Sequence, residues 1–271
     1  MSETTIEKIS DGAADKRGAD AVVKTAGRVF EVLELFREVR TPLSVRDIAE
    51  RCNYPVSSTS VLLKSLATMG YLTYDRDLRA FFPTLRIATL GDWLYDALYG
   101  SGDVLRLLED ICRDTGETAL LAVQNDIYAQ YVHVQPNRQQ VIQLNVPMGT
   151  RRLLCWSGTG WAMLSQFSDE AIERLVERTL TRLRNDPLAE SITLANVMER
   201  VEAARRDGYA LSSQTVTSGA GVVAIPLPVT ANGMRMAVAA GGVAERMVAR
   251  KDDIAKIMAA HVQRYTATLR D

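Results

Sequence analysis

The stretch that most constrains the fold is LSVRDIAERCNYPVSSTSVLLKSLATMG, residues 43–70, where signals for helix starts and helix ends follow one another closely. Ser44 is a candidate N-cap, and Asp47 stands three residues later, as a capping box requires. Leu43 and Ile48 occupy the two positions of a hydrophobic staple. These signals agree within six residues and predict a short helix that begins after Ser44.

A longer helix is expected next, between Pro55 and Gly70. A proline lacks the N–H that a first helical residue would leave unused, and glycine suits the left-handed position after a helix end. The apolar stripe at helical spacing is Thr59, Leu62, Leu63, Leu66 and Met69. The opposite face carries Ser57, Ser60, Val61, Lys64 and Thr68.

A helix before this stretch and a hairpin after it complete a recognisable order of elements. Apolar residues recur at helical spacing from about Ala21 until Thr41-Pro42 ends the pattern. After Gly70, YLTY, a polar DRDLR turn and AFFP predict a small β-hairpin. Helix, short helix, tight turn, helix and hairpin together predict a winged helix-turn-helix over residues 21–83.

The remaining chain predicts a linker helix and a second, α+β domain. Residues 1–20 have a polar composition typical of a disordered tail, residues 84–102 continue as an amphipathic helix to Gly100-Ser101-Gly102, and residues 103–271 form the second domain. Its expected strands are ETALLAVQ and IYAQYVHVQ, joined at Asn125-Asp126, then VIQLNV, and finally VVAIPLPV and MRMAVAA around Asn232-Gly233. Its expected helices cover 103–114, 158–167, 168–179 and 191–207, with a last one from about Glu245. Hairpin strands with helices in blocks predict an antiparallel sheet with helices packed on it.

Composition excludes several classes of protein. The net charge of -1 is not that of a basic coat for nucleic acid, and three cysteines without a CxxC pair argue against a zinc knuckle or a disulfide framework. No apolar run reaches the ~18 residues of a membrane span, and the N-terminus lacks the apolar core of a signal peptide, so we expect a cytoplasmic protein without membrane contact.

Enzyme motifs are missing from the sequence as well. The two histidines, His133 and His261, accompany no nucleophile motif, and neither HExxH nor GxSxG occurs. GAGVVA at 219–224 matches the glycine spacing of a dinucleotide site, but it leads into VVAIPLPV, whose prolines exclude the helix that such a site needs. The acidic residues show no metal-ligand spacing, so we expect neither a catalytic residue, nor a metal site, nor a cofactor.

Three separated segments resemble the IclR-type bacterial transcriptional regulators. They are LSVRDIAERCNYPVSSTSVLLKSLATMGYL, GTRRLLCWSGTGWAMLSQF and GYALSSQTVTSGAGVVAIPLPVTANGMRMAVAAGG, in one consistent order over about Ala21 to Leu269. The resemblance implies a winged-helix head and a GAF-like effector domain. It also implies a homodimer or dimer of dimers that binds double-stranded operator DNA and responds to a small-molecule effector.

Within the helix-turn-helix, the second helix enters the major groove and its exposed face reads base edges. The candidate DNA-binding residues are Ser44, Ser57, Ser58, Ser60, Val61 and Lys64, with Arg76 and Arg79 at the wing tip. The alternative is that the serines only cap the helix and the arginines are only solvated. Residues 21–102 hold ten Lys/Arg and nine Asp/Glu, a weak electrostatic footprint for DNA.

The resemblance places the effector pocket between the sheet and the loop before the helix predicted at 158–167. The backbone N–H groups at the start of that helix could seat a carboxylate, with plain N-capping and close glycine packing as the alternative. The candidate effector-binding residues are Val141, Leu144, Met148, Cys155, Ser157, Gly158, Thr159, Gly160, Ser212, Val222, Ala239 and Gly241. Several are neutral or apolar where the resemblance leads one to expect polar groups, which favours an aromatic or relatively apolar carboxylate.

We therefore expect a sequence-specific transcriptional regulator, repressor or activator, whose operator affinity or activity responds to an effector. The alternative is a ligand-sensing protein whose DNA-binding head has degenerated and which acts through a protein partner. Val56 and Val61 on the recognition helix and the neutral charge of the head keep that alternative open. Trp156, Trp161 and Met148 are candidates either for the pocket or for the ordinary core.

Overall fold

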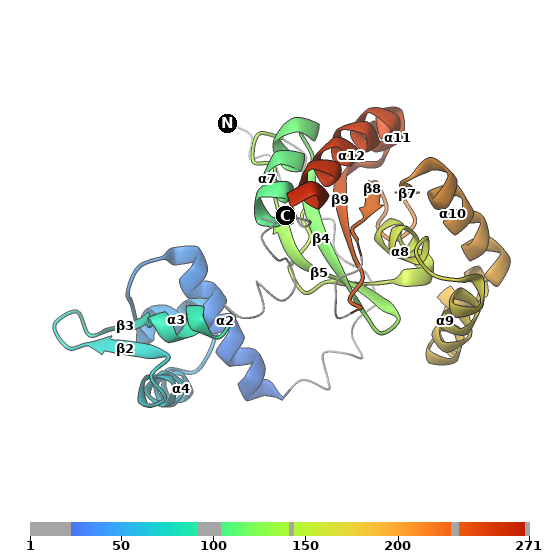
Figure 1. Ribbon diagram of the computed structural model, residues 1–271. Helices are drawn as coiled ribbons and strands as arrows, with labels where there is room; N and C mark the ends of the chain where they lie inside the picture. Colours follow the sequence, from blue (N-terminus) through green and yellow to red (C-terminus); the bar gives the residue numbers. More distant parts are fainter. Residues whose placement is uncertain (1–22, 92–103, 141–143, 229–232, 269–271) are drawn as a thin grey trace, which may run out of the picture. The chain divides into compact units, whose positions relative to one another are not determined.

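The structure is a computed structural model that describes residues 23–91, 104–140, 144–228 and 233–268 (Figure 1). The predicted tail, Val141 and most of the predicted linker helix lie outside these residues. The chain divides into two compact units, Met1–Ala97 and Leu98–Asp271. They are called the head and the sensor domain below, and each is described by itself.

The head is a winged helix-turn-helix with a three-stranded sheet. Its elements are α2 (Lys24–Val39), β1 (Leu43–Ser44), α3 (Val45–Arg51), α4 (Val56–Thr68), β2 (Leu72–Asp75), β3 (Ala80–Pro83) and α5 (Leu85–Thr89). The strand order is β1-β3-β2, and both pairs are antiparallel. The core of the head packs Val32 and Phe36 of α2 against Ile48 of α3, Leu63 of α4 and Phe81 of β3. The predicted hairpin is therefore confirmed. β1, a strand of two residues, pairs with β3 and adds a third strand to the sheet.

Local hydrogen bonds fix both ends of the helix-turn-helix. At the start of α3 the capping box is complete, because Asp47 N–H donates to Ser44 Oγ and the Asp47 carboxylate accepts from Ser44 N–H. At the end of α4, Gly70 has φ +79°. Its N–H donates to Ala67 O, and Tyr71 N–H donates to Leu66 O. This pair of bonds is a Schellman motif, which only a residue with positive φ in the Gly70 position permits without strain.

The head differs from expectation at three positions. Pro55 is the N-cap of α4 and not its first helical residue, because its extended ψ of 133° precedes the helix. Met69 is 50% exposed, because it follows the last helical residue and leaves the buried stripe. The predicted linker helix begins as α5 but ends at Thr89, with a turn at Leu90 and Gly91; the rest of that prediction lies outside the described residues.

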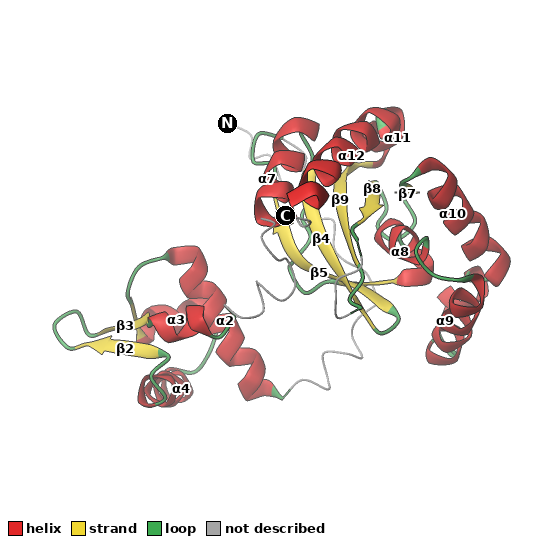
Figure 2. Cartoon of the chain, viewed as in Figure 1, coloured by secondary structure: helices red, strands yellow, loops and turns green. Residues whose placement is uncertain are grey.

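The sensor domain is a six-stranded antiparallel sheet with helices on both faces (Figures 1 and 2). Its strands are β4 (Thr118–Asn125), β5 (Tyr128–Gln135), β6 (Arg151–Leu153), β7 (Ala210–Ser213), β8 (Ala220–Pro226) and β9 (Met236–Val243), in the order β6-β5-β4-β9-β8-β7. Its helices are α7 (Val104–Thr115), α8 (Gly158–Leu164), α9 (Asp169–Arg182), α10 (Leu194–Asp207), α11 (Ala244–Ala249) and α12 (Lys251–Thr268). Short 3₁₀ turns, η1 (Leu154–Trp156) and η2 (Pro187–Ser191), precede α8 and α10.

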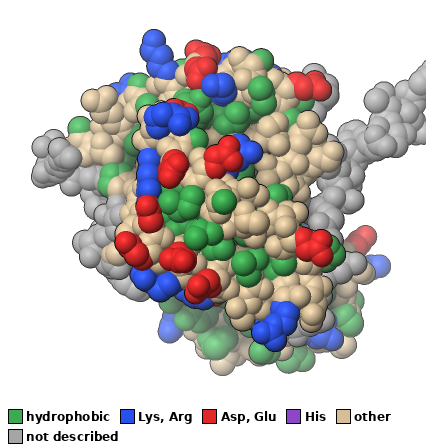
Figure 3. All heavy atoms as spheres, turned by 90° about the vertical axis from the view of Figure 1, so that its right-hand side faces the viewer, with side chains coloured by type: hydrophobic (Ala, Val, Ile, Leu, Met, Phe, Trp, Pro, Cys, Tyr) green, Lys and Arg blue, Asp and Glu red, His purple; other side chains and the backbone are tan. Residues whose placement is uncertain are grey.

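Alternation along the strands divides the interior into two cores. In β4, Leu120 and Ala122 face the core shared with α8, α9 and α10, whereas Ala119 and Leu121 face the core shared with α7 and α12. β9 alternates in the same way, which is why its residues are almost all buried. Acidic and basic side chains intermingle on the outer face to which α9 and α10 contribute, without a field of one sign (Figure 3).

Three predictions for the sensor domain need correction. Leu144–Val146, the described part of the predicted strand VIQLNV, is not a strand; the chain turns at Gly149, with φ +84°, and β6 pairs with β5 instead. The β4–β5 turn is Asp126-Ile127, one residue later than expected, and Asp126 takes the positive φ. The single terminal helix is divided into α11 and α12 at Arg250.

Candidate DNA-binding face and effector cavity

The exposed face of α4 carries the residues that could reach base edges. Ser57 and Lys64 are exposed, Ser60 is half-buried, and Val61 is 66% exposed. Lys64 offers an ammonium donor, the serines offer hydroxyls, and Val61 offers methyl groups. Such a set can form hydrogen bonds with bases or phosphates and an apolar contact with a thymine methyl.

Two of the candidate serines already bond within the head. Ser44 Oγ donates to the Asp47 carboxylate at 2.7 Å, and Ser58 Oγ donates to Pro55 O at 3.0 Å. The bonds from Ser44 are also the main cause that lowers the pKa of the Asp47 carboxyl below its ordinary value. Both hydroxyls therefore have partners within the head. Ser44 caps α3, as the capping alternative expects, whereas Ser58 donates to a carbonyl and α4 has no side-chain N-cap bond.

The wing presents both candidate arginines to solvent. Arg76 and Arg79 lie in the four-residue turn between β2 and β3, and both are exposed. Asp75 Oδ1 organises this turn by accepting the N–H groups of Asp77 and Leu78 at 2.8 and 2.9 Å. The turn thus holds two guanidinium groups on a short, hydrogen-bonded tip, which is a geometry suited to phosphate contacts.

Five of the candidate effector residues line one small cavity in the sensor domain, called here the effector cavity. They are Leu144, Ser157, Gly158, Ser212 and Val222. The cavity volume is about 30 Å³. Gly241 lies directly behind it, because a Cβ at Gly241 would clash with Leu144 Cδ2 and lie 3.6 Å from Val222 Cγ2. Pairing of Ser212 with Val222, and of Val222 with Gly241, brings these three positions side by side across β7, β8 and β9.

The start of α8 takes the form of a plain N-cap with close glycine packing. Ser157 Oγ accepts from Gly160 N–H at 3.1 Å and donates to Leu153 O at 2.8 Å. Gly160 packs against the backbone of Leu154, including its carbonyl carbon at 2.6 Å from the position of an added Cβ. The Gly160 N–H is therefore already bonded to Ser157 within the protein. This arrangement agrees with the alternative of plain N-capping and close glycine packing, and not with an N–H group that is free to bind a carboxylate.

The remaining candidates lie elsewhere. Thr159, Gly160 and Ala239 are buried, Ala239 in the core beneath α8, and Met148 is half-buried away from the lining of the effector cavity. Cys155 is also buried; its Sγ lies 3.7 Å from Thr179 Oγ1, and burial raises the pKa of its thiol to about 11. Trp161 is only 4% exposed and belongs to the core.

Several residues of the effector cavity were not predictable from the sequence. Arg152 of β6 and Tyr131 of β5 line it, together with Thr215 and Thr217 from the loop between β7 and β8. Arg152 is the one arginine in this lining. The one sequence signal for Arg152 is its position between the turn at Gly149 and the start of α8. That position indicates a cavity residue only when the pairing of β6 with β5 is known.

The described residues contain no cluster of His, Cys, Asp or Glu that could hold a metal ion. His261 is buried and structural: its Nε2 lies 2.8 Å from an Asp114 oxygen, and its Nδ1 lies 2.8 Å from an Arg264 nitrogen. None of the helices in the described segments has the length and apolarity that crossing a bilayer requires.

Comparison with known proteins agrees with this architecture over both units. Residues 25–76 match the IclR helix-turn-helix domain, and residues 103–266 match the bacterial transcriptional regulator IclR C-terminal domain. The HTH-type transcriptional repressor AllR of Salmonella typhimurium is 25% identical over 236 residues, 86% of this chain and 83% of that protein.

Two solved structures extend the comparison. The Thermotoga maritima IclR structure has a TM-score of 0.62 at 20% identity, covering 91% of this chain and 98% of that one. An IclR homologue from Microbacterium hydrocarbonoxydans, complexed with 4-hydroxybenzoate, has a TM-score of 0.57 at 19% identity, covering 91% and 99%.

A winged helix-turn-helix followed in one chain by a separate antiparallel-sheet domain is the architecture of a helix-turn-helix transcriptional regulator, the class to which these relatives belong. More specifically, the chain belongs to the IclR family of bacterial transcriptional regulators.

Proposed function

We propose that this regulator reads its operator through the exposed face of α4 and the wing, and that an effector in the sensor domain changes its operator affinity. The observation that carries the proposal is the exposed set Ser57, Val61 and Lys64 on α4, with Arg76 and Arg79 on the neighbouring hairpin of the same unit. An effector can act in this way only if it binds unequally to two arrangements of the protein.

Fluorescence anisotropy with DNA from upstream of the protein's own gene, compared with scrambled DNA, tests the operator site. If Lys64 and Arg76 contact phosphates, the double variant Lys64→Ala with Arg76→Ala lowers the slope of log affinity against log salt by about 1.8, since each phosphate contact contributes about 0.9. Arg174→Ala with Lys256→Ala removes the same charge from exposed positions of the sensor domain and should leave the slope unchanged. Unchanged operator binding by the first double variant would refute the assignment.

We further propose that the effector is an aromatic or relatively apolar carboxylate. Leu144, Val146 and Val222 give the effector cavity an apolar lining, and Arg152 supplies one cation that could face a carboxylate. The IclR homologue from Microbacterium hydrocarbonoxydans was solved with a ligand of this class, 4-hydroxybenzoate. A cavity of about 30 Å³ holds roughly one water molecule. Entry of a ring therefore requires the side chains that line the cavity to move apart.

A thermal-shift series with benzoate, glyoxylate and pyruvate checks the class of effector. Benzoate should raise the melting temperature most, because its ring can pack against Leu144, Val146 and Val222 while its carboxylate faces Arg152, whereas glyoxylate and pyruvate have little apolar surface to bury there. Arg152→Gln should reduce the shift. A large shift with glyoxylate or pyruvate, while aromatic acids are inert, would refute the proposal.

The competing function is a sensor that acts through a protein partner, with a head that no longer reads DNA. Val56 and Val61, 55% and 66% exposed on α4, favour it, as does the nearly balanced charge of the head. A sequence-specific footprint on upstream DNA separates the two. Self-association as a homodimer or dimer of dimers is proposed with either function, and light scattering after gel filtration measures it.

A further inference from the structure

A second and larger hollow lies between η1, α8 and α10, and we call it the tryptophan groove. Its volume is about 380 Å³, and Trp156, Trp161 and Arg200 are among the residues that line it. Ligand pockets in proteins usually have volumes of about 300–1,000 Å³, so the groove is large enough for an aromatic ring as it stands. The effector cavity, at about 30 Å³, is not.

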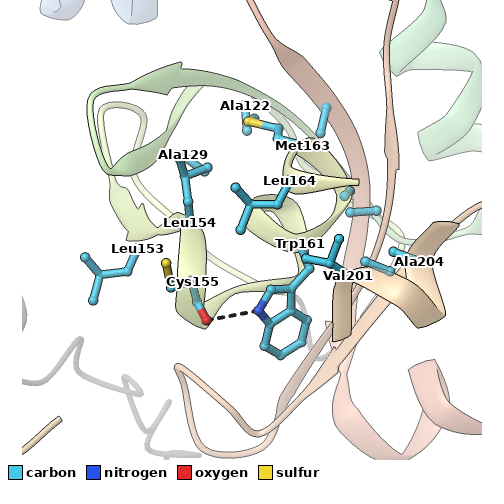
Figure 4. Close-up of a cluster of buried hydrophobic side chains, with 14 of the residues drawn as sticks. Ala122, Ala129, Leu153, Leu154, Cys155, Trp161, Met163, Leu164, Val201 and Ala204 are labelled. Atoms are coloured by element: carbon cyan, nitrogen blue, oxygen red, sulfur yellow. Dashed lines mark hydrogen bonds between the residues drawn. The ribbon is translucent and has the colours of Figure 1, made fainter. Parts of the chain in front are cut away.

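The two indoles give the groove rigid, apolar walls. Trp161 Nε1–H donates to Cys155 O at 3.0 Å, a bond drawn in Figure 4, and Trp156 Nε1–H donates to Thr215 O at 3.1 Å. Because both N–H groups are bonded to the backbone, the rings present carbon surface and not hydrogen-bond donors. Buried Ile192 and Val197 extend this apolar surface.

Arg200 places a cation over that apolar surface. Its guanidinium carbon lies 5.5 Å from the centre of the Trp161 ring, and the side chain belongs to an exposed residue of α10. Within the described ranges, Arg200 has no hydrogen bond or ion pair. Two other arginines of α10 differ, because Arg205 pairs with Asp169 and Arg206 pairs with Asp207. A guanidinium without an acidic partner beside an indole can accept an anion.

We propose that the tryptophan groove is a binding site for a planar aromatic monocarboxylate, distinct from the effector cavity. The carboxylate pairs with Arg200, and the ring attached to it lies against the indoles. Glu199 also lines the groove, and its negative charge disfavours a ligand with two carboxylates. The proposal does not depend on DNA binding by the head.

The groove and the effector cavity share one residue. Thr215 lines both, and its carbonyl oxygen holds the Trp156 indole. A ring that moves Trp156 therefore acts on the loop between β7 and β8, which also forms a wall of the effector cavity. Occupancy of the groove is expected to change the affinity of the effector cavity by a reciprocal coupling.

Isothermal titration calorimetry of the full chain tests the site, with benzoate as the probe. Arg200→Gln should weaken benzoate binding at the groove at least about tenfold, since a charge-assisted hydrogen bond is lost, and should leave binding at the effector cavity in place. Arg206→Gln, the same change on the same helix, should leave it as in the wild type. Cyclohexanecarboxylate, which keeps the charge but not the planar ring, and phthalate, which adds a second carboxylate, should both bind more weakly than benzoate.

Arg152→Gln distinguishes this site from the effector cavity, because it should leave the affinity that depends on Arg200 intact. Equal benzoate binding by the wild type and by Arg200→Gln would overturn the proposal. So would loss of all benzoate binding in Arg152→Gln while that variant keeps the circular dichroism spectrum of the wild type. Arg200 is exposed, so its replacement is not expected to unfold the sensor domain.

Discussion

The two glycines of α8 differ in what surrounds them, and replacing each by alanine should change the stability by very different amounts. A Cβ at Gly160 would meet three backbone atoms of Leu154, the carbonyl carbon among them at 2.6 Å. A Cβ at Gly158 would meet Ser212 Oγ at 2.8 Å. The Ser212 hydroxyl can rotate to another rotamer, whereas a buried backbone carbonyl cannot move without displacing η1.

The magnitude follows from the two environments. Alanine favours a helix over glycine by about 1 kcal/mol, while overpacking a core costs typically about 1–3 kcal/mol and sometimes more. Because the clash at Gly160 involves only backbone, we expect Gly160→Ala to lose about 3 kcal/mol in the free energy of unfolding. Gly158→Ala should stay within about 1 kcal/mol of the wild type, because rotation of Ser212 relieves most of the clash.

Thermal unfolding followed by near-ultraviolet circular dichroism measures the difference, since Trp161 lies within this helix and Trp156 lies just before it. For a domain of this size, about 3 kcal/mol corresponds to a fall of about 6–12 °C in the melting temperature. Gly158→Ala serves as the matched control. If Gly160→Ala melts within 1–2 °C of the wild type, about the shift of half a kcal/mol, the close packing of α8 against η1 is not as described.

Three further predictions concern charge and capping. Ser44→Ala should cost the head about 1 kcal/mol, the usual loss for an N-cap, measured by urea unfolding of the full chain with a probe in the head. The Asp47 pKa lies below its ordinary 3.8, so its bonds stabilise the head above about pH 4 and are lost as the pH falls through the folded value; Asp47→Asn should make unfolding less sensitive to pH in that range. Glu117, 1% exposed, forms a bidentate pair with Arg246 at 2.5 and 2.7 Å, and Glu117→Ala should destabilise the sensor domain by about 3 kcal/mol in chemical denaturation; a loss below 1 kcal/mol would contradict the burial of this pair.

The sequence predicts the head better than the sensor domain because the signals in the head are local. Ser44 and Asp47 are three residues apart, and Gly70 closes a helix with bonds to its last turn, so neighbouring residues decide these structures. In the sensor domain, the apolar run around Leu144 favours a strand, but β6 at Arg151–Leu153 takes the place beside β5. Which of the two segments pairs with β5 depends on side-chain packing across the sheet and not on the local sequence alone.

The candidate sites also differ in this way: those in the head depend on local sequence, and those in the sensor domain depend on strand pairing. The positions of Arg76 and Arg79 are predictable, because a polar turn between two short strands that follow a helix-turn-helix forms the tip of a wing. Arg152 is not, because it joins Ser212 and Val222 at the effector cavity only through the pairing of β6, β7 and β8 with their neighbours. Cys155 shows that neighbours in the sequence can also be separated by the fold. Cys155 in η1 lines the tryptophan groove, whereas Ser157 and Gly158, two and three residues later, line the effector cavity.

The strand order has a consequence for how the protein is made. β4 and β9 are neighbours at the centre of the sheet, yet Thr118 must wait for its partner Gly241 to be synthesised. At about 5–20 residues per second, the ribosome needs many seconds to cover that interval, whereas the head is complete once Pro83 has emerged. Each new chain therefore holds a finished DNA-binding unit before its sheet can close, and a message cut short before β9 would yield a head tethered to a sensor that cannot fold.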